Sequence, residues 1–253
     1  MNQRSFFPFS GIPVVTKNLI IINLIFWIAS FTMPEKYDLT ALLGLHYPYS
    51  ESENFRPHQL ITYMFMHAGF THFFFNMFAV YMFGRVIESV WGPKRFLTYY
   101  MITGIGAGLI QLLVIYIRVK GIEANFDPET INGVYRDGFS YMKDSMNYTN
   151  PSLRALNNLI NTTTVGASGA VFGILLAFGM LFPNMPLYII PFPFPIKAKY
   201  LVTGYGVLEL FLGIARIPGD SIAHFAHLGG MLFGILFVIY YKKKDRDNGR
   251  YFY

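Results

Sequence analysis

Four polar residues in apolar stretches of this chain have types and spacing suited to acyl-transfer chemistry. Ser168 lies in a run of small residues at 166–169, and His227 is followed closely by a Gly-Gly pair. His72 and Asn76 are four residues apart, so they share one face of a helix. Histidine is the usual base that activates a serine, and histidine and asparagine side chains can donate hydrogen bonds to an oxyanion. We therefore expect Ser168 and His227 to be catalytic and His72 and Asn76 to stabilise the oxyanion.

The composition around these residues is that of an integral membrane protein. Of 253 residues, 53% are hydrophobic and only 13% are charged, whereas a soluble domain has about 25% charged residues. A soluble chain of this kind would expose large apolar patches, and its hydrophobicity also excludes disorder. The sequence contains no cysteine, which excludes disulfides and cysteine-ligated metals.

Six apolar stretches are candidates for membrane-spanning helices, each of which needs about 20 residues. They cover residues 17–33, 71–88, 96–117, 165–182, 200–214 and 222–241. The expected fold class is therefore all-α: a polytopic membrane protein with one six-helix domain over residues 1–253. The first stretch has no small-residue cleavage site after it, so we interpret it as a retained helix and not as a signal peptide.

The distribution of charge predicts how this bundle is oriented. With both termini in the cytoplasm, the cytoplasmic segments carry a net charge of +9 and the opposite segments −2; Glu209, within a span, completes the total of +6. The positive-inside rule favours this orientation. Because the basic residues are spread along one membrane face, the net charge does not indicate nucleic-acid binding.

The same orientation places the four polar residues at one depth. Ser168, His227, His72 and Asn76 all lie near the outer ends of their spans, which at 1.5 Å per residue puts them in the outer ~10 Å of the membrane. A Gly-x-x-x-Gly pair begins one residue after Ser168 and three residues after His227, and such pairs permit close helix packing. Glu209 is mid-way along its span or deeper, so we expect it to be poorly placed to orient His227 and prefer a Ser–His dyad.

These motifs resemble those of the rhomboid family of intramembrane serine proteases over most of residues 55–235. The runs around Ser168 and His227 resemble the family's nucleophile and base motifs, and His72-x-x-x-Asn76 resembles its oxyanion motif. Further similar positions are Phe55-Arg56, where the family has Trp-Arg, and Glu88, Gly92, Arg95 and Phe96. The resemblance implies a six-helix core that cleaves transmembrane protein substrates near the membrane surface. Phe172 stands where the family often has a tyrosine stacked on the base, and it can still stack.

Other classes of function stay open at this point. An inactive rhomboid-like protein would bind clients, and a proton-coupled transporter could use His227, His72 and Glu209 as a relay, although no repeated halves are evident. A metal site made of His67, His72, His224 and His227 lacks the H-E-x-x-H pattern of zinc proteases. We expect no metal and no cofactor.

Two further expectations concern location and loops. No eukaryotic transit peptide is apparent, which favours a bacterial plasma membrane with the site facing the outer side. Residues 118–164 are polar with little periodicity, so we expect this loop to be partly irregular. The apolar stretch 60–70 is too short to span and is expected at the membrane interface or re-entering it.

Overall fold

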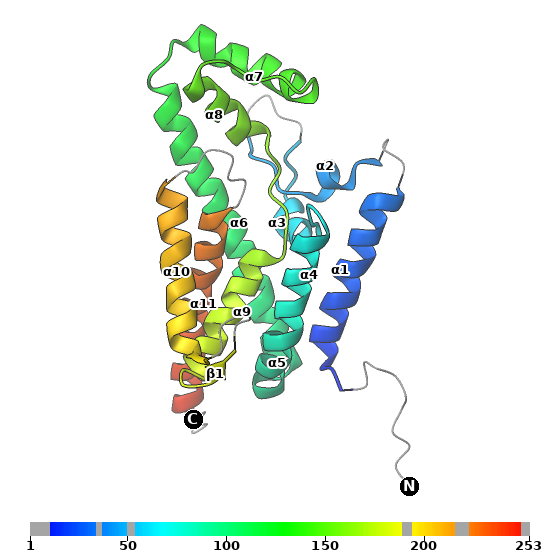
Figure 1. The fold of residues 1–253 in the computed structure, drawn as a ribbon, viewed down its shortest axis with the longest axis vertical. Helices are drawn as coiled ribbons and strands as arrows, with labels where there is room; N and C mark the ends of the chain where they lie inside the picture. The colour runs from blue at the N-terminus through cyan, green and yellow to red at the C-terminus, as the bar shows by residue number, and fades with distance from the viewer. Residues whose placement is uncertain (1–10, 34–36, 50–53, 189–193, 216–222, 249–253) are drawn as a thin grey trace.

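The computed structural model describes residues 11–33, 37–49, 54–188, 194–215 and 223–248, and Figure 1 shows its helical architecture. The expected start of the last span, residue 222, lies outside these ranges, as do several charges used to predict the orientation. The helices are α1 (Val14–Thr32), α2 (Leu39–Leu43), α3 (Gln59–Thr62), α4 (Phe70–Ala79), α5 (Arg85–Trp91), α6 (Pro93–Glu123), α7 (Pro128–Lys143), α8 (Pro151–Asn161), α9 (Ser168–Leu181), α10 (Ala198–Ala215) and α11 (His224–Asp247). A 3₁₀ turn, Tyr63–Phe65, follows α3, and a π-helical turn, Val80–Gly84, joins α4 to α5. Strands β1 (Pro186–Leu187) and β2 (Ile196–Lys197) pair antiparallel.

The protein is an all-helical, polytopic membrane protein. Within the described residues, five helical segments are long and apolar enough to cross a membrane: Val14–Thr32, Phe70–Trp91, Pro93–Glu123, Ala198–Ala215 and His224–Asp247. The stretch predicted at 165–182 forms the shorter helix α9, with 14 residues. Its length of about 21 Å falls short of a hydrocarbon core of about 30 Å. Because nine of its residues are buried by its neighbours, this helix depends on protein contacts more than on lipid.

Helices α9 and α11 approach each other closely because both present glycine. A Cβ added at Gly230 of α11 would collide with the carbonyl oxygen of Gly169 in α9, and one added at Gly169 would overlap the side chain of Ala107 in α6. Small residues of this kind let helix backbones pack closely in membranes. The contact fixes the relative position of the two helices that carry Ser168 and His227.

Buried charged residues secure the end of the bundle where α1 begins and α11 ends (Figure 1). The carboxylate of Glu88 accepts hydrogen bonds from Val15 N at 2.9 Å, and from Thr16 N and Thr16 Oγ1 at 2.7 Å each. These donors include backbone N–H groups that a helix N-terminus leaves without intrahelical partners. Nearby, Arg95 pairs with Asp245 at 2.6 Å. Glu88 is therefore a structural anchor for α1.

Residues 118–164 are helical over most of their length, and the expected irregular backbone is limited to the segments between the helices and just before α9. Helix α6 is 31 residues long, about 46 Å, so it extends beyond a hydrocarbon core of about 30 Å and leads into α7 and α8 (Figure 1). Each of these two helices starts with a side-chain cap, from Asp127 and Asn150 respectively, followed by proline. Their apolar faces share a separate core with α6, made of Tyr47, Ile115, Val119, Ile131, Val134, Leu156 and Ile160.

The apolar stretch 60–70 is partly buried in the helix bundle, whereas Ile61 and Phe70 are 42% and 63% exposed. Tyr63, Met64 and Met66 are each at most 2% exposed. The Tyr63 hydroxyl donates to the carbonyl of Gly104 in α6 at 2.6 Å. This stretch therefore supports the loop before α9, because Tyr63 also contacts Gly166 in that loop.

Candidate active site

Ser168 is the first residue of α9, and the loop before it is held from two sides. The N–H of Gly166 donates to the carbonyl of Tyr63 at 2.9 Å, and Leu45 and Thr164 form an isolated β-bridge. Gly166 has a φ of +125°, a conformation that side chains with a Cβ rarely adopt. The loop thus places the Ser168 side chain and the free N–H groups of the α9 N-terminus at one point.

The structure brings Ser168 and His227 into hydrogen-bond contact. The distance from Ser168 Oγ to His227 Nε2 is 2.8 Å. Phe172, one turn after Ser168, stacks on the imidazole with ring centroids 4.3 Å apart and planes 7° apart. The predicted stacking of Phe172 is therefore confirmed. With the serine hydroxyl as donor, this contact has the geometry that a nucleophile and its general base require.

His72 reaches the site, whereas the Asn76 side chain is engaged elsewhere. A Cβ added at Gly166 would lie 2.6 Å from Cε1 and 2.7 Å from Nε2 of His72, so the imidazole lies against the loop that precedes Ser168. Asn76 is buried on the same helix, and its Nδ2 donates to the His72 carbonyl at 2.9 Å. Of the two predicted oxyanion donors, the described contacts thus place His72 beside the serine loop and hold Asn76 within α4.

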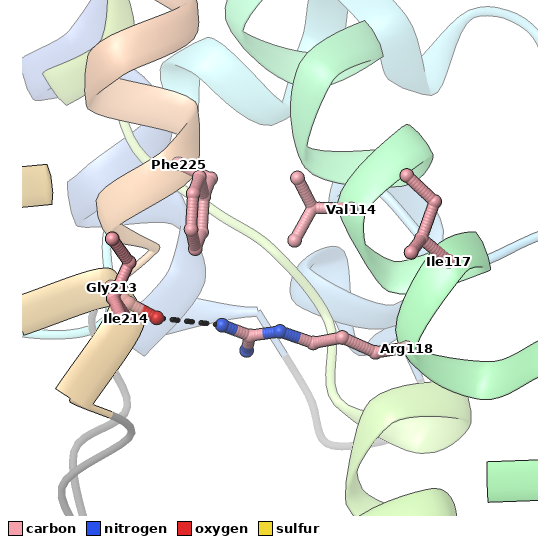
Figure 2. Close-up of a pocket in the computed structure, with 6 residues that line it drawn as sticks. All are labelled: Val114, Ile117, Arg118, Gly213, Ile214 and Phe225. Carbon is pink, nitrogen blue, oxygen red and sulfur yellow. Dashed lines mark hydrogen bonds between the residues drawn. The ribbon is translucent and has the colours of Figure 1, made fainter. Parts of the chain in front are cut away.

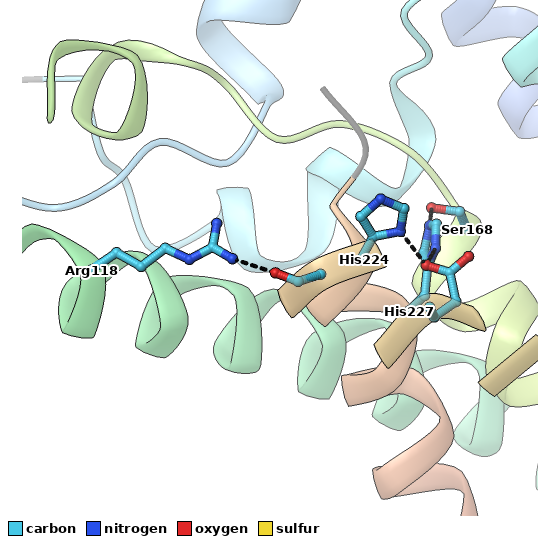
Figure 3. A network of polar contacts seen from close by, with 6 residues as sticks. Arg118, Ser168, His224 and His227 are labelled. Carbon is cyan, nitrogen blue, oxygen red and sulfur yellow. Dashed lines mark hydrogen bonds and ion pairs between the residues drawn. The ribbon is translucent and has the colours of Figure 1, made fainter. Parts of the chain in front are cut away.

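Glu209 lies at the site, and the expectation that it is poorly placed was wrong. Its Oε2 is 2.6 Å from His224 Nδ1 and 2.9 Å from His227 Nδ1. Figure 3 shows both histidines next to Ser168. Counting residues from span ends missed the contact because it ignored which face of α10 packs against α11. Gly213, one turn after Glu209, lies directly against Phe225. The available signal was Gly213, four residues after Glu209 on the same helix face. A glycine on that face could have indicated that it packs closely against another helix.

Arg118 ties α6 to this part of α10. Its Nη2 donates to the Gly213 carbonyl at 2.8 Å, and its guanidinium lies 5.3 Å from the centre of the Phe225 ring. Figure 2 shows this contact across a cavity of about 300 Å³. The cavity is lined by Val114, Ile117, Arg118, Gly213, Ile214 and Phe225. None of the predicted site residues lines it, so it is a separate feature from the Ser168–His227 pair.

The histidines do not group as the metal hypothesis required. His67 is buried and packs edge-on against His72, with ring centroids 5.1 Å apart. A different set, Glu209, His224 and His227, has ligand atoms within 4.8 Å of one another. These donors could reach one metal ion, but the hydrogen bond and the ion pair among them already account for their proximity.

Comparison with known proteins gives a family match over most of the helices described above. The Rhomboid domain family model covers residues 54–119 and 131–244, from just before α3 into the last turn of α11. RHOMBOID-like protein 12, mitochondrial, of Arabidopsis thaliana is 31% identical over 69% of this chain and 44% of its own length. Rhomboid protease AarA of Providencia stuartii is 27% identical over 70% of this chain and 53% of its own length. The putative rhomboid protease YdcA of Bacillus subtilis is 26% identical over 74% of this chain and 70% of its own length.

The match spans about half the length of the first two of these relatives. Within this chain, however, it covers well over half of the residues and every helix that contributes to the site. The shared segment includes the serine on α9, the histidines on α4 and α11 and the helices that hold them together. The chain belongs to the rhomboid family.

Proposed function

We propose that the protein is an intramembrane serine endopeptidase that hydrolyses peptide bonds in or near transmembrane segments of membrane-protein substrates. The observation that carries this proposal is the 2.8 Å contact between Ser168 Oγ and His227 Nε2, with Phe172 stacked on the imidazole. Relatives whose names state protease activity, such as Rhomboid protease AarA, support the same class of reaction.

The proposed reaction proceeds by acyl transfer. Ser168 Oγ attacks the scissile carbonyl while His227 Nε2 takes its proton, and His227 then gives that proton to the leaving amine. The Ser168 backbone N–H at the start of α9, together with His72 and Asn76, stabilises the oxyanion. Asn76 must exchange its bond to the His72 carbonyl for the oxyanion to do so. Water then hydrolyses the acyl-enzyme and regenerates Ser168.

The proposal includes a topology. Helix α9 serves as the sixth, shortened span, and both termini lie in the cytoplasm. Support comes from Lys242, Lys243 and Lys244 near the end of α11, at the end of the bundle opposite α7 and α8 (Figure 1), since cytoplasmic segments are enriched in basic residues. The site then faces the outer side, and the membrane we propose is a bacterial plasma membrane.

The test is cleavage of a reporter transmembrane substrate by purified protein in liposomes. Ser168→Ala and His227→Ala are expected to abolish cleavage, because each removes one partner of the reacting pair. Ser30→Ala is the matched control, since this serine in α1 bonds only to the Trp27 carbonyl among the described contacts. Cleavage by Ser168→Ala at the wild-type rate contradicts the proposal and favours a client-binding or transport function.

A further inference from the structure

Glu209 is a buried acidic residue within a candidate membrane-spanning helix. It lies within the candidate span α10 and its residue surface is 8% exposed. An ionised side chain inside a membrane is costly unless it has a partner. The groups that face its Oε2 are two imidazoles one turn apart on α11, His224 and His227.

The contacts favour one position for the hydrogen on each imidazole. An ionised carboxylate only accepts hydrogen bonds, so the hydrogen bond from His224 requires N–H at its Nδ1, and the 2.9 Å approach of His227 Nδ1 to the same oxygen favours N–H there as well. A neutral imidazole carries one N–H, so Nε2 of His227 keeps its lone pair. That nitrogen faces Ser168 Oγ at 2.8 Å. Glu209 thus favours the tautomer of His227 that can accept the serine proton.

The two histidines use the carboxylate differently. His224 forms an aligned hydrogen bond to Oε2 at 2.6 Å, whereas His227 Nδ1 lies 2.9 Å from the same oxygen without hydrogen-bond alignment. His224 therefore holds the carboxylate in place, and its charge remains directed at His227. Catalytic hydrogen bonds are often poorly aligned before substrate binds and tighten in the complex.

The surrounding packing keeps Glu209 in this position. One turn further along α10, Gly213 packs directly on Phe225 of α11 and its carbonyl accepts from Arg118 of α6. Helix α10 is thus fixed against both α6 and α11 one turn from Glu209, and Figure 2 shows Gly213, Phe225 and Arg118 at this contact. A rigid acid of this kind is pre-organised to stabilise charge that develops beside it.

We propose that Glu209 is a positioning residue that completes a Ser168–His227–Glu209 arrangement, with His224 as the anchor of the carboxylate. This inference rests on the proposed protease function. During acylation the proton of Ser168 moves to His227 Nε2, and the imidazolium is stabilised by the carboxylate, which itself takes no proton. Glu209 does not touch the substrate and acts only through His227.

The experiment measures the rate at which a fluorophosphonate probe phosphonylates the serine with loss of fluoride, as the readout of the acylation step, together with kcat and KM for a reporter substrate. Glu209→Gln is expected to slow acylation about 100-fold or more and to lower kcat with KM within about threefold, because the amide can donate to Nδ1 and favour the wrong tautomer. Glu209→Asp, which keeps the charge, is expected to react at least about tenfold faster than Glu209→Gln. The matched control is Glu88→Gln, another buried acid, whose acylation rate per folded molecule should stay within about twofold of wild type.

A second measurement uses the wild-type protein alone, in case the variants do not fold. Nitrogen-15 NMR of labelled histidine should show His227 with its hydrogen on Nδ1. An Nε2–H tautomer in the wild type overturns the proposal, as does wild-type acylation by Glu209→Gln. Loss of wild-type activity on chelation, with recovery on adding zinc, also overturns it by assigning the cluster to a metal.

Failure of this inference and failure of the proposed function give different results. If Ser168→Ala is unreactive while Glu209→Gln acylates normally, the protease proposal stands and the role of Glu209 is refuted. If Ser168→Ala retains wild-type labelling and cleavage, the proposed function itself is wrong.

Discussion

The two ends of the helix bundle stabilise a buried glutamate in different ways. At the end where α1 begins, Glu88 accepts hydrogen bonds from the backbone N–H groups of Val15 and Thr16 and from the Thr16 hydroxyl. At the end near α7 and α8, Glu209 faces the imidazoles of His224 and His227. Both glutamates are less than 10% exposed.

The difference lies in the donors. Backbone N–H and hydroxyl groups at a helix N-terminus do not titrate. The negative charge of Glu88 therefore serves only to hold α1 in place. An imidazole can accept a proton and become positively charged, so the fixed negative charge of Glu209 lies where it can stabilise positive charge that forms on His227. A buried acid in a membrane protein is therefore best judged by its partners and not by its burial.

The largest effect that sharpens this comparison is expected from Gly230→Ala. The added Cβ collides with the Gly169 carbonyl, so α11 must move away from α9 and carry His227 with it. A displacement of about 1 Å can cost about 100-fold in rate, and we expect kcat/KM for a reporter substrate to fall by that order. Gly133→Ala is the control, since nothing lies within 4 Å of its added Cβ. Unchanged activity in Gly230→Ala would show that the helix contact does not set the site.

Glu88→Gln tests the structural end of the comparison. Replacing the charged acceptor weakens three hydrogen bonds at the start of α1, and the expected loss in unfolding free energy is about 2 kcal/mol. Denaturant titration in detergent measures it. A fall in the acylation rate of the folded protein, without loss of stability, would contradict the division between the two ends.

His67 offers a third kind of buried titratable group, one without a carboxylate. Burial, together with the neighbouring His72, lowers the pKa of His67 to about 3, whereas its pKa in the unfolded chain is about 6.5. The unfolded state therefore binds a proton that the folded state does not, and stability falls as the pH drops from about 6.5 toward 3, by at most about 1.4 kcal/mol per pH unit. His67→Phe should reduce this slope in unfolding measurements at pH 7 and pH 4.5. Equal slopes for wild type and variant would exclude a neutral, buried His67.

The smallest expected effect concerns the ring stacked on His227. Phe172→Leu removes an aromatic stack worth about 1 kcal/mol, so kcat/KM should fall about fivefold. Phe172→Tyr keeps the ring and should stay within about threefold of wild type. A Leu variant with wild-type kcat/KM would show that the stack does not hold the imidazole for catalysis.

Much of the site was predictable from local patterns. Small residues beside Ser168 and His227 indicated close helices, and the glycine contact between α9 and α11 now explains their 2.8 Å approach. The stacking of Phe172 was expected from the resemblance to the rhomboid family, and its position four residues after Ser168 places it on the serine's helix face. These inferences succeeded because they depend on spacing within one helix or on direct backbone contact.

Other features depend on how helices are packed and were missed. The contact of Glu209 with His227 depends on the face that α10 presents to α11, which the position of a residue along a span does not reveal. The helices α7 and α8 were obscured by their polar composition, although their apolar residues recur at helical spacing. The short length of α9 follows from the loop at Gly166, whose positive φ delays the helix until Ser168.

The most direct test of the central claim is to map the residue labelled by a fluorophosphonate probe on the intact protein by mass spectrometry. The account predicts one labelled residue, Ser168, with labelling lost in Ser168→Ala and in His227→Ala but retained in Ser30→Ala. Labelling of another residue, or labelling that persists in Ser168→Ala, would contradict it.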